Sequence, residues 1–207
     1  MAVTWLNRLA LAVLDAAPRR MWGFSPRLMP VLAERLGPAR SSAWFMSNMP
    51  RYQRTLKAFG PLRTHVLATA ISLRNGCRYC TLGHATALEL IYLRDRDKLF
   101  PLDENAIAEL GGMEPDELRR RLGDALRQAG LEEELPWLDR LFELAANERT
   151  PDGGPDDARL AHLIDMFAVL NACGIAGNVE PDQTHDEINK DTALKERYSR
   201  LRAESNA

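Results

Sequence analysis

The chain has 207 residues, enough to bury a substantial core as one domain or as two small helical halves. Its hydrophobic content of 45% and charged content of 27% are those of an ordinary soluble globular protein. The formal net charge of −2 gives no reason to expect nucleic acid or an anionic membrane as a partner. An odd number of cysteines, three, does not make a disulfide framework in a chain of this length.

The N-terminal segment contains only a short apolar run, from Leu9 to Leu14. This run is shorter than the core of a typical signal peptide, and Pro18-Arg19-Arg20 is a poor cleavage context. We find no stretch that approaches the roughly 20 apolar residues needed to span a bilayer. We therefore expect a protein of the reducing cytoplasm, where a CxxC pair is more often catalytic or metal-binding than structural.

Helical periodicity predominates along the chain, and no segment shows the alternation of a convincing strand. Proline and glycine mark most of the expected helix ends, as at Pro18, Pro50 and Gly60-Pro61. Pro61 suits the first position of a helix. In the first half, helices are expected over 5–16, 26–36, 39–49, 51–59, 61–74 and 77–94.

The second half of the chain is also predicted to be helical. Its expected helices cover 103–110, 114–129, 132–147, 156–173 and 186–203. The clearest loop runs from Thr150 to Pro155. The chain is therefore predicted to be all-α, with an N-terminal helical extension over 1–60, a central helical domain over 61–180 and a C-terminal polar helix over 181–207.

The segment Cys77-Arg78-Tyr79-Cys80-Thr81-Leu82-Gly83-His84 is the most informative part of the chain. In a helix, steps of three and four residues bring both thiols and the imidazole within roughly 60° of arc on one face. Asn75-Gly76 predicts a turn, which would put both cysteines at the first turn of a new helix. There the free backbone N–H groups and the helix dipole favour thiolate over thiol.

At helical spacing, the same face continues with Leu88 and Ile91. We therefore expect the reactive groups at the exposed end of a buried apolar stripe, a setting that suits a small, partly apolar substrate. The alternative is a pair of core cysteines with a hydrogen-bonded histidine. Cys173, near the end of another apolar helix, is expected to be a buried small hydrophobe.

The preceding helix carries His65, Thr69 and Ser72 on one polar stripe beside an apolar one. An imidazole beside two hydroxyls could pass protons to or from the thiols. A solvated or capped histidine is the alternative for His65. His162 and His185 stand alone, without metal-ligand spacing, and are expected to be structural or solvated.

Two other functions remain open at this point. Cys77, Cys80 and His84 offer three zinc ligands, and His65 could supply a fourth. A CxxC followed by histidine on one continuous helix is, however, poorly placed to close a tetrahedron, so no metal is expected. In the other alternative, the chain is a non-catalytic helical subunit whose CxxC pair senses redox state through an oligomer contact.

A long helix followed by Arg-Asn-Gly-Cys-x-Tyr-Cys-x-x-x-His resembles the alkyl hydroperoxidase D-like branch of the carboxymuconolactone decarboxylase family, and the match covers residues 61–95. The resemblance implies an all-helical bundle that assembles as a dimer, trimer or hexamer. It also implies a peroxiredoxin-type oxidoreductase that needs no cofactor and reduces small peroxides through a CxxC disulfide. A lipoyl-type or thioredoxin-like dithiol would restore the pair.

Cys77 and Cys80 match the family's redox pair, and His84 matches the histidine that follows it. Because the second cysteine usually attacks the peroxide, the resemblance implies that Cys80 is peroxidatic and Cys77 resolving. His65 stands where the best-known member has a glutamate, and Tyr79 stands where it has a histidine. His65 can still carry protons, but with a different charge and pKa. The predicted catalytic residues are thus Cys77, Cys80, His84 and His65.

Overall fold

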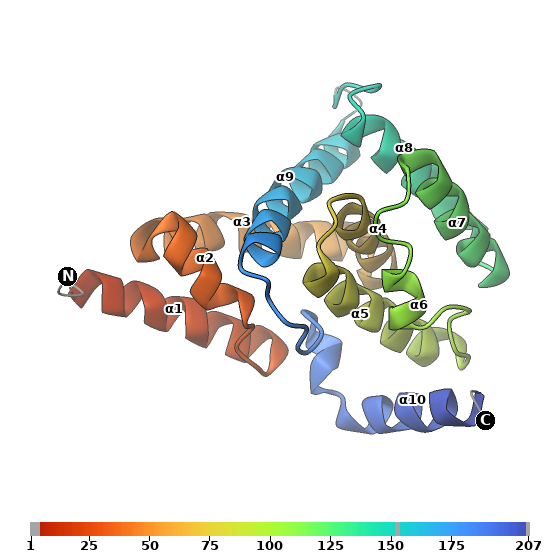
Figure 1. Cartoon of the computed structure of the whole chain (residues 1–207), viewed down its shortest axis with the longest axis horizontal. Helices are drawn as coiled ribbons and strands as arrows, with labels where there is room; N and C mark the ends of the chain where they lie inside the picture. The colour runs from red at the N-terminus through yellow and green to blue at the C-terminus, as the bar shows by residue number, and fades with distance from the viewer. Residues whose placement is uncertain (1–4, 152–153, 206–207) are drawn as a thin grey trace.

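The computed structural model describes residues 5–151 and 154–205, and this part of the chain is helical without any strand (Figure 1). The expected all-α class is confirmed. The first helices are α1 (Trp5–Trp22), α2 (Leu28–Leu36), α3 (Pro38–Phe59), α4 (Pro61–Arg74), α5 (Arg78–Arg96) and α6 (Glu104–Ala108). The later elements are α7 (Pro115–Gln128), η1 (Glu132–Glu134), α8 (Leu135–Ala145), α9 (Pro155–Ala176), η2 (Glu187–Lys190) and α10 (Thr192–Ser205).

Two expected helix ends are wrong, both at a proline. Helix α1 continues through Pro18, and α3 is one helix that contains Pro50. An interior proline removes one hydrogen bond and costs about 3 kcal/mol. In α3, Phe45, Met49 and Tyr52 bury side chains on both sides of the proline, which itself is exposed, so packing outweighs the local penalty.

Other boundaries differ by a turn. The helix expected to end at residue 173 continues to Ala176. The expected terminal helix is divided into η2 and α10, because an aspartate caps each of them. Asp186 accepts a hydrogen bond from the Ile188 N–H at 2.8 Å, and Asp191 accepts one from the Leu194 N–H at 2.9 Å.

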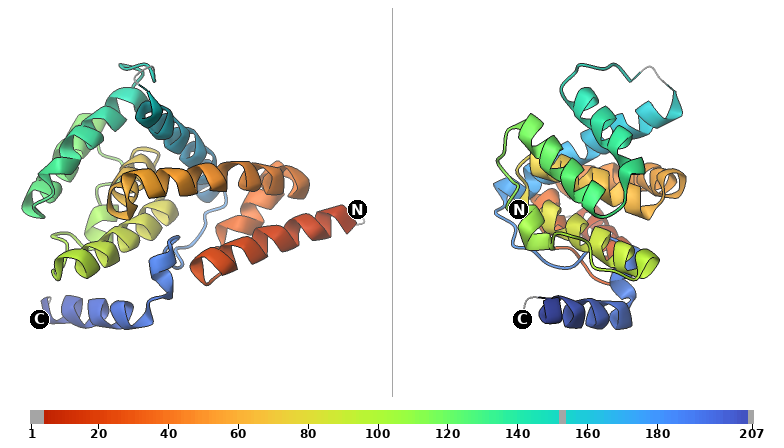
Figure 2. Two further views of the ribbon diagram at one scale, coloured as in Figure 1. Left: turned by 180° about the vertical axis from the view of Figure 1, so that it is seen from behind. Right: turned by 90° about the vertical axis from the view of Figure 1, so that its right-hand side faces the viewer.

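Helices α4 and α5 form the centre of the molecule, and the other helices surround them (Figures 1 and 2). Every residue of α4 from Thr64 to Leu73 is buried. The N-terminal helices α1–α3 contribute to the same hydrophobic cluster as α4, α5 and α9. A smaller cluster joins α5 to η2 and α10, which lies along the opposite side of the molecule from α9 in Figure 1.

Helix α9 is, within the described ranges, the one helix long and apolar enough to cross a membrane by length and composition. In the structure it is a core helix. Leu160, Leu163 and Phe167 are buried, and α9 packs against α2, α3, α4, α5 and α8. Its last turn carries Cys173 and Gly174 to the start of α5.

Candidate active site

The two cysteines of the CxxC pair lie at the start of α5, where the sequence places a turn. Gly76 takes a φ of +77°, which glycine adopts without strain, and the chain then enters the helix. Cys77 is the N-cap residue, and its sulfur accepts a hydrogen bond from the Cys80 N–H at 3.3 Å. The pair therefore sits at the positive end of the helix dipole.

Both thiols are free and lie side by side. The two sulfurs are within hydrogen-bond distance, 2.7 Å apart. A disulfide bond is about 2.05 Å long, so its formation needs only a small movement. Two thiolates on one tetrahedral zinc ion would stand about 3.7 Å apart, which is a wider spacing than this.

The electrostatic surroundings of the two sulfurs differ. The hydrogen bond from Cys80, together with the backbone N–H groups of Cys80 and Tyr79, lowers the pKa of Cys77 although burial opposes this. Burial raises the pKa of Cys80 well above its usual value, and the hydrogen bond to Cys77 and the charge of Cys77 add to that. The reduced pair therefore favours a thiolate at Cys77, whereas the family resemblance implies that Cys80 attacks.

The expected position of the pair at an exposed helix end is wrong. Cys77 is only 1% and Cys80 only 3% exposed. The last turn of α9 covers them, and a Cβ at Gly174 would lie 2.8 Å from Cys77 Sγ and 3.7 Å from Cys80 Sγ. Cys173 is buried beside them, as expected, and burial raises its pKa. The covering turn lies nearly 100 residues from the cysteines along the chain, so no local sequence pattern predicts it.

The two candidate histidines meet each other in the interior. His65 of α4 is fully buried and His84 of α5 is 3% exposed. Their Nδ1 atoms are 3.1 Å apart, and His65 Nε2 lies 2.9 Å from Asp186 Oδ2. Within the described part of the chain, neither ring makes a hydrogen bond to a sulfur. The structure thus forms a chain Asp186–His65–His84, whose last member lies one helical turn after Cys80 on α5.

Asp186 is the acidic end of this hydrogen-bonded chain. Burial opposes ionisation of Asp186, but the hydrogen bond and charge of His65 lower its pKa. The carboxylate then accepts from His65 Nε2–H. The 3.1 Å contact between the two Nδ1 atoms requires one proton, which either ring can carry. Burial, together with His65 and His185, lowers the pKa of His84, which keeps this ring neutral at physiological pH.

The hydroxyls that share a stripe with His65 do not join this chain. Thr69 and Ser72 are buried, and neither hydroxyl has a hydrogen-bond partner in the described structure. His65 instead turns its two ring nitrogens to His84 and Asp186. The proton path suggested by the sequence is therefore replaced by one that runs between helices.

A second group of site residues comes from the segment 181–186, which sequence reasoning missed. Thr184 Oγ1 donates to Gly83 O at 2.6 Å and so holds this segment on α5. Tyr79 OH contacts Asp182 Oδ2 at 3.1 Å and His185 Nε2 at 2.8 Å. The available signal was the cluster Asp-x-x-His-Asp directly after an apolar helix.

His185, expected to be structural or solvated, belongs to this site. Its ring stacks on Phe24, with ring centroids 5.8 Å apart and planes inclined by 12°. It also lies over Gly83, where a Cβ would be 3.0 Å from His185 Nδ1. A glycine at this position of α5 therefore lets the histidine approach the helix backbone.

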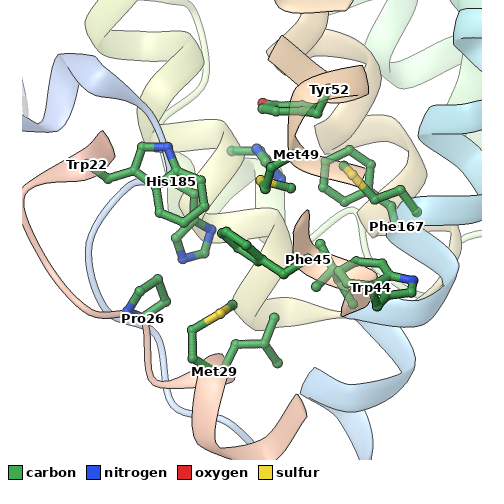
Figure 3. A pocket seen from close by; sticks show the side chains of 13 residues that line it. Trp22, Pro26, Met29, Trp44, Phe45, Met49, Tyr52, Phe167 and His185 are labelled. Carbon is green, nitrogen blue, oxygen red and sulfur yellow. The ribbon is translucent and has the colours of Figure 1, made fainter. Parts of the chain in front are cut away.

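An apolar pocket opens beside His84 and His185 (Figure 3). Its cavity volume is about 40 Å³, room for a few atoms without movement of the walls. Most of the walls come from α1–α3 and the turn between α1 and α2, so residues 1–60 build much of the pocket. The lining residues are Trp22, Pro26, Leu28, Met29, Trp44, Phe45, Met49, Tyr52, His84, Met166, Phe167, Leu170 and His185.

The polar groups in this pocket are few. His84 and His185 reach it from one side. Tyr52 contributes a hydroxyl that is buried without a hydrogen-bond partner in the described structure, and burial raises the pKa of this phenol, so that it stays a donor. A ligand that fits is mostly apolar and carries one small group that both donates and accepts hydrogen bonds.

The ligand set considered for zinc does not converge. Among the residues that the structure describes, no group of three or more His, Cys, Asp or Glu side chains is arranged to hold a metal ion. His84 faces His65 rather than the sulfurs. The donor geometry thus does not fit a tetrahedral site.

Comparison with known proteins adds no relative. No family model, no curated protein and no solved structure matches this chain. The kinship inferred from the CxxCxxxH segment stays a prediction.

Proposed function

We propose that the protein is a thiol-dependent peroxidase or disulfide reductase, similar in chemistry to the alkyl hydroperoxidase D-like proteins. The observation that carries the proposal is the pair of sulfurs 2.7 Å apart at a helix N-terminus. The neutral His84 one helical turn after the pair supports it, as does the apolar pocket that His84 lines. A redox-active dithiol needs these elements: a stabilised thiolate, a partner thiol and a route for protons.

The reaction begins at the sulfur whose thiolate is favoured, which in the reduced pair is Cys77. The thiolate attacks the terminal oxygen of a hydroperoxide, the O–O bond breaks, and the alkoxide leaves as an alcohol after taking a proton. Cys77 is then a sulfenic acid. Cys80 attacks the sulfenic sulfur, the hydroxide leaves as water, and the disulfide forms. Each cycle consumes one peroxide and two thiols, and yields one alcohol, one water and one disulfide.

Protons move through the histidine chain in this proposal. In the tautomer that we propose, His84, one helical turn after Cys80 on α5, donates Nδ1–H to His65 and keeps a lone pair on Nε2. It accepts the proton that Cys80 releases on attack and returns it to the leaving oxygen. His65 and Asp186 hold the tautomer in which this lone pair is available.

The regeneration step requires an external dithiol, for which we propose a lipoyl-type or thioredoxin-like molecule. Both sulfurs are nearly inaccessible, so the last turn of α9, which covers them, has to move before a disulfide exchange can occur. A slender dithiol arm suits such an opening better than a flat protein surface. We also propose a homo-oligomer in the cytoplasm, with neither membrane nor nucleic acid as a partner.

Trapping the intermediate tests both the chemistry and the order of attack. We expect the wild type to consume about one equivalent of tert-butyl hydroperoxide in a single turnover and to form a Cys77–Cys80 disulfide. In Cys80→Ser, dimedone should label a sulfenic acid at Cys77, detected by mass spectrometry, while turnover stops. The matched control Cys173→Ser keeps the third thiol out of the reaction and should behave as the wild type.

Two outcomes would change the proposal. Rapid labelling of Cys80 in Cys77→Ser, with slow reaction of Cys80→Ser, would reverse the roles of the two sulfurs but keep the dithiol cycle. Unchanged, catalytic peroxide consumption by both single variants would refute the cycle itself.

A further inference from the structure

A second groove lies apart from the cysteine site, where α3 and α9 pack against each other. Its cavity volume is about 330 Å³, and it shares no lining residue with the apolar pocket. Most of its polar lining is basic. The lining residues are Arg51, Arg54, Thr55, Pro155, Ala158, Arg159 and His162.

Two of the three arginines are free to bind a ligand. Arg51 and Arg54 are exposed, and neither has an ion-pair or hydrogen-bond partner for its guanidinium within the described residues. Arg159 is held by Asp156 at 2.7 Å. The groove therefore presents about two uncompensated positive charges on successive turns of one helix. This charge matches a dianion better than a carboxylate.

His162 supplies an independent sign of a ligand. The residue is only 5% exposed, yet its Nδ1 has no hydrogen-bond partner in the described structure. Its Nε2 lies 3.0 Å from Asn48 Oδ1. Because the Asn48 amide nitrogen donates to Trp44 O, Asn48 turns its oxygen to His162, and the ring proton sits on Nε2. His162 lines the groove, and the lone pair on its Nδ1 is buried without a donor to meet it.

Burial, helped by two nearby arginines, keeps the His162 ring neutral. Burial lowers its pKa first, followed by the positive charges of Arg51 and Arg54, while Asp165 on α9 acts in the opposite direction. A neutral ring offers an acceptor, not a cation. A bound group that completes the site must therefore bring a proton to Nδ1 and negative charge to the arginines.

We propose that this groove binds the phosphate group of a small phosphorylated molecule, with its oxygens on Arg51 and Arg54 and one shared proton between phosphate and His162 Nδ1. A phosphate monoester has a second pKa of about 6, close to that of histidine, so it can supply this proton near neutral pH. Guanidinium groups bind phosphate oxygens through paired N–H donors. A carboxylate or a sulfate brings no proton at neutral pH and leaves Nδ1 unsatisfied.

Methyl phosphate is a suitable probe, titrated into the full-length protein by calorimetry. We expect saturable one-to-one binding that weakens by about tenfold or more between pH 6 and pH 8, because the free ligand loses the proton that the complex retains. Sulfate should bind at least about tenfold more weakly at pH 7. In NMR, saturating methyl phosphate should raise the pKa of His162 by about one unit, since a dianion faces the ring.

Two matched double variants distinguish binding in the groove from attraction to positive charge elsewhere on the protein. Arg51→Gln/Arg54→Gln should weaken methyl phosphate by at least about tenfold. Arg40→Gln/Lys57→Gln removes the same charge from exposed positions of α3 outside the groove and should bind as the wild type. Equal weakening in both variants, equal binding of sulfate, or no saturable binding would each overturn the proposal. Because all four positions are exposed, helicity measured by circular dichroism should be unchanged.

Discussion

At the scale of single residues, Gly174 decides how closely α9 can cover the cysteines. The position is helical, and a Cβ there would lie 2.8 Å from Cys77 Sγ, nearer than nonbonded atoms tolerate. Glycine costs about 1 kcal/mol of helix propensity at such a position. That cost is offset by the close approach of helix backbone and sulfur, which buries the two cysteines.

We therefore expect Gly174→Ala to destabilise the protein by about 1–3 kcal/mol, because the added methyl overpacks the sulfur. Gly123→Ala is the matched control. Its Cβ would meet its nearest atoms at 3.5 Å, so this change in α7 should instead add up to about 1 kcal/mol of stability. Urea denaturation measures both effects. Equal changes in the two variants would show that the sulfur does not set the requirement at 174.

At the scale of elements, α10 is joined to α5 by a buried acidic cluster. Glu89 is fully buried, and it contacts Tyr198 OH and, at 2.6 Å, Arg202 Nη2. Tyr198 OH also contacts Glu104 Oε2 at 2.7 Å. One hydroxyl proton serves only one of two carboxylates, so the second contact needs a proton on a carboxyl. Burial raises the pKa of Glu89 to about 8, although Tyr198 and Arg202 act to lower it.

The attachment of α10 should accordingly weaken as the pH rises. The folded-state pKa of Glu89, about 8, lies above the ordinary glutamate value of 4.5, so its contribution is complete below pH 4.5 and is lost as the pH rises through 8. We expect Glu89→Gln to remove a stability difference on the order of a few kcal/mol between pH 5 and pH 9. Glu109→Gln, at an exposed glutamate of the same region, should retain it. Thermal unfolding at several pH values measures the slope, and identical slopes in both variants would contradict the assignment.

At the scale of the whole molecule, the described residues of the N-terminal segment, 5–60, do not form a peripheral layer. Trp22 and Phe45 from these residues belong to the same hydrophobic cluster as Leu67 and Phe167. Trp22 also lies against His185, with ring centroids 5.6 Å apart. The N-terminal helices therefore complete both the core and the pocket.

A shared core predicts one cooperative unfolding transition. In Trp137→Phe, the remaining tryptophans all lie in α1 and α3, so fluorescence reports the N-terminal helices while circular dichroism reports the whole chain. We expect the two urea midpoints to coincide. An earlier fluorescence midpoint would mean that the N-terminal helices unfold as a unit of their own.

Local signals predicted part of the fold well. The expected helix over 61–74 agrees with α4, because Gly60-Pro61 and Asn75-Gly76 are strong start and stop signals. Pro50 gave a wrong boundary since the buried faces before and after it belong to one continuous packing surface. The spacing of residues along each helix also identified His84 and His65 as candidates, but it did not predict that their rings contact each other.

The amino-acid sequence by itself determined the helical class, the dithiol at a helix start and the imidazole one turn further on, because each depends on residues within a few turns of one another. Tertiary structure alone decided that Asp186 orients His65, that Gly174 covers the sulfurs and that Tyr52 faces a pocket. These contacts join segments about 100 residues apart, and the free energy that selects them comes from burying whole helix faces. No pattern within a single helix carries that information.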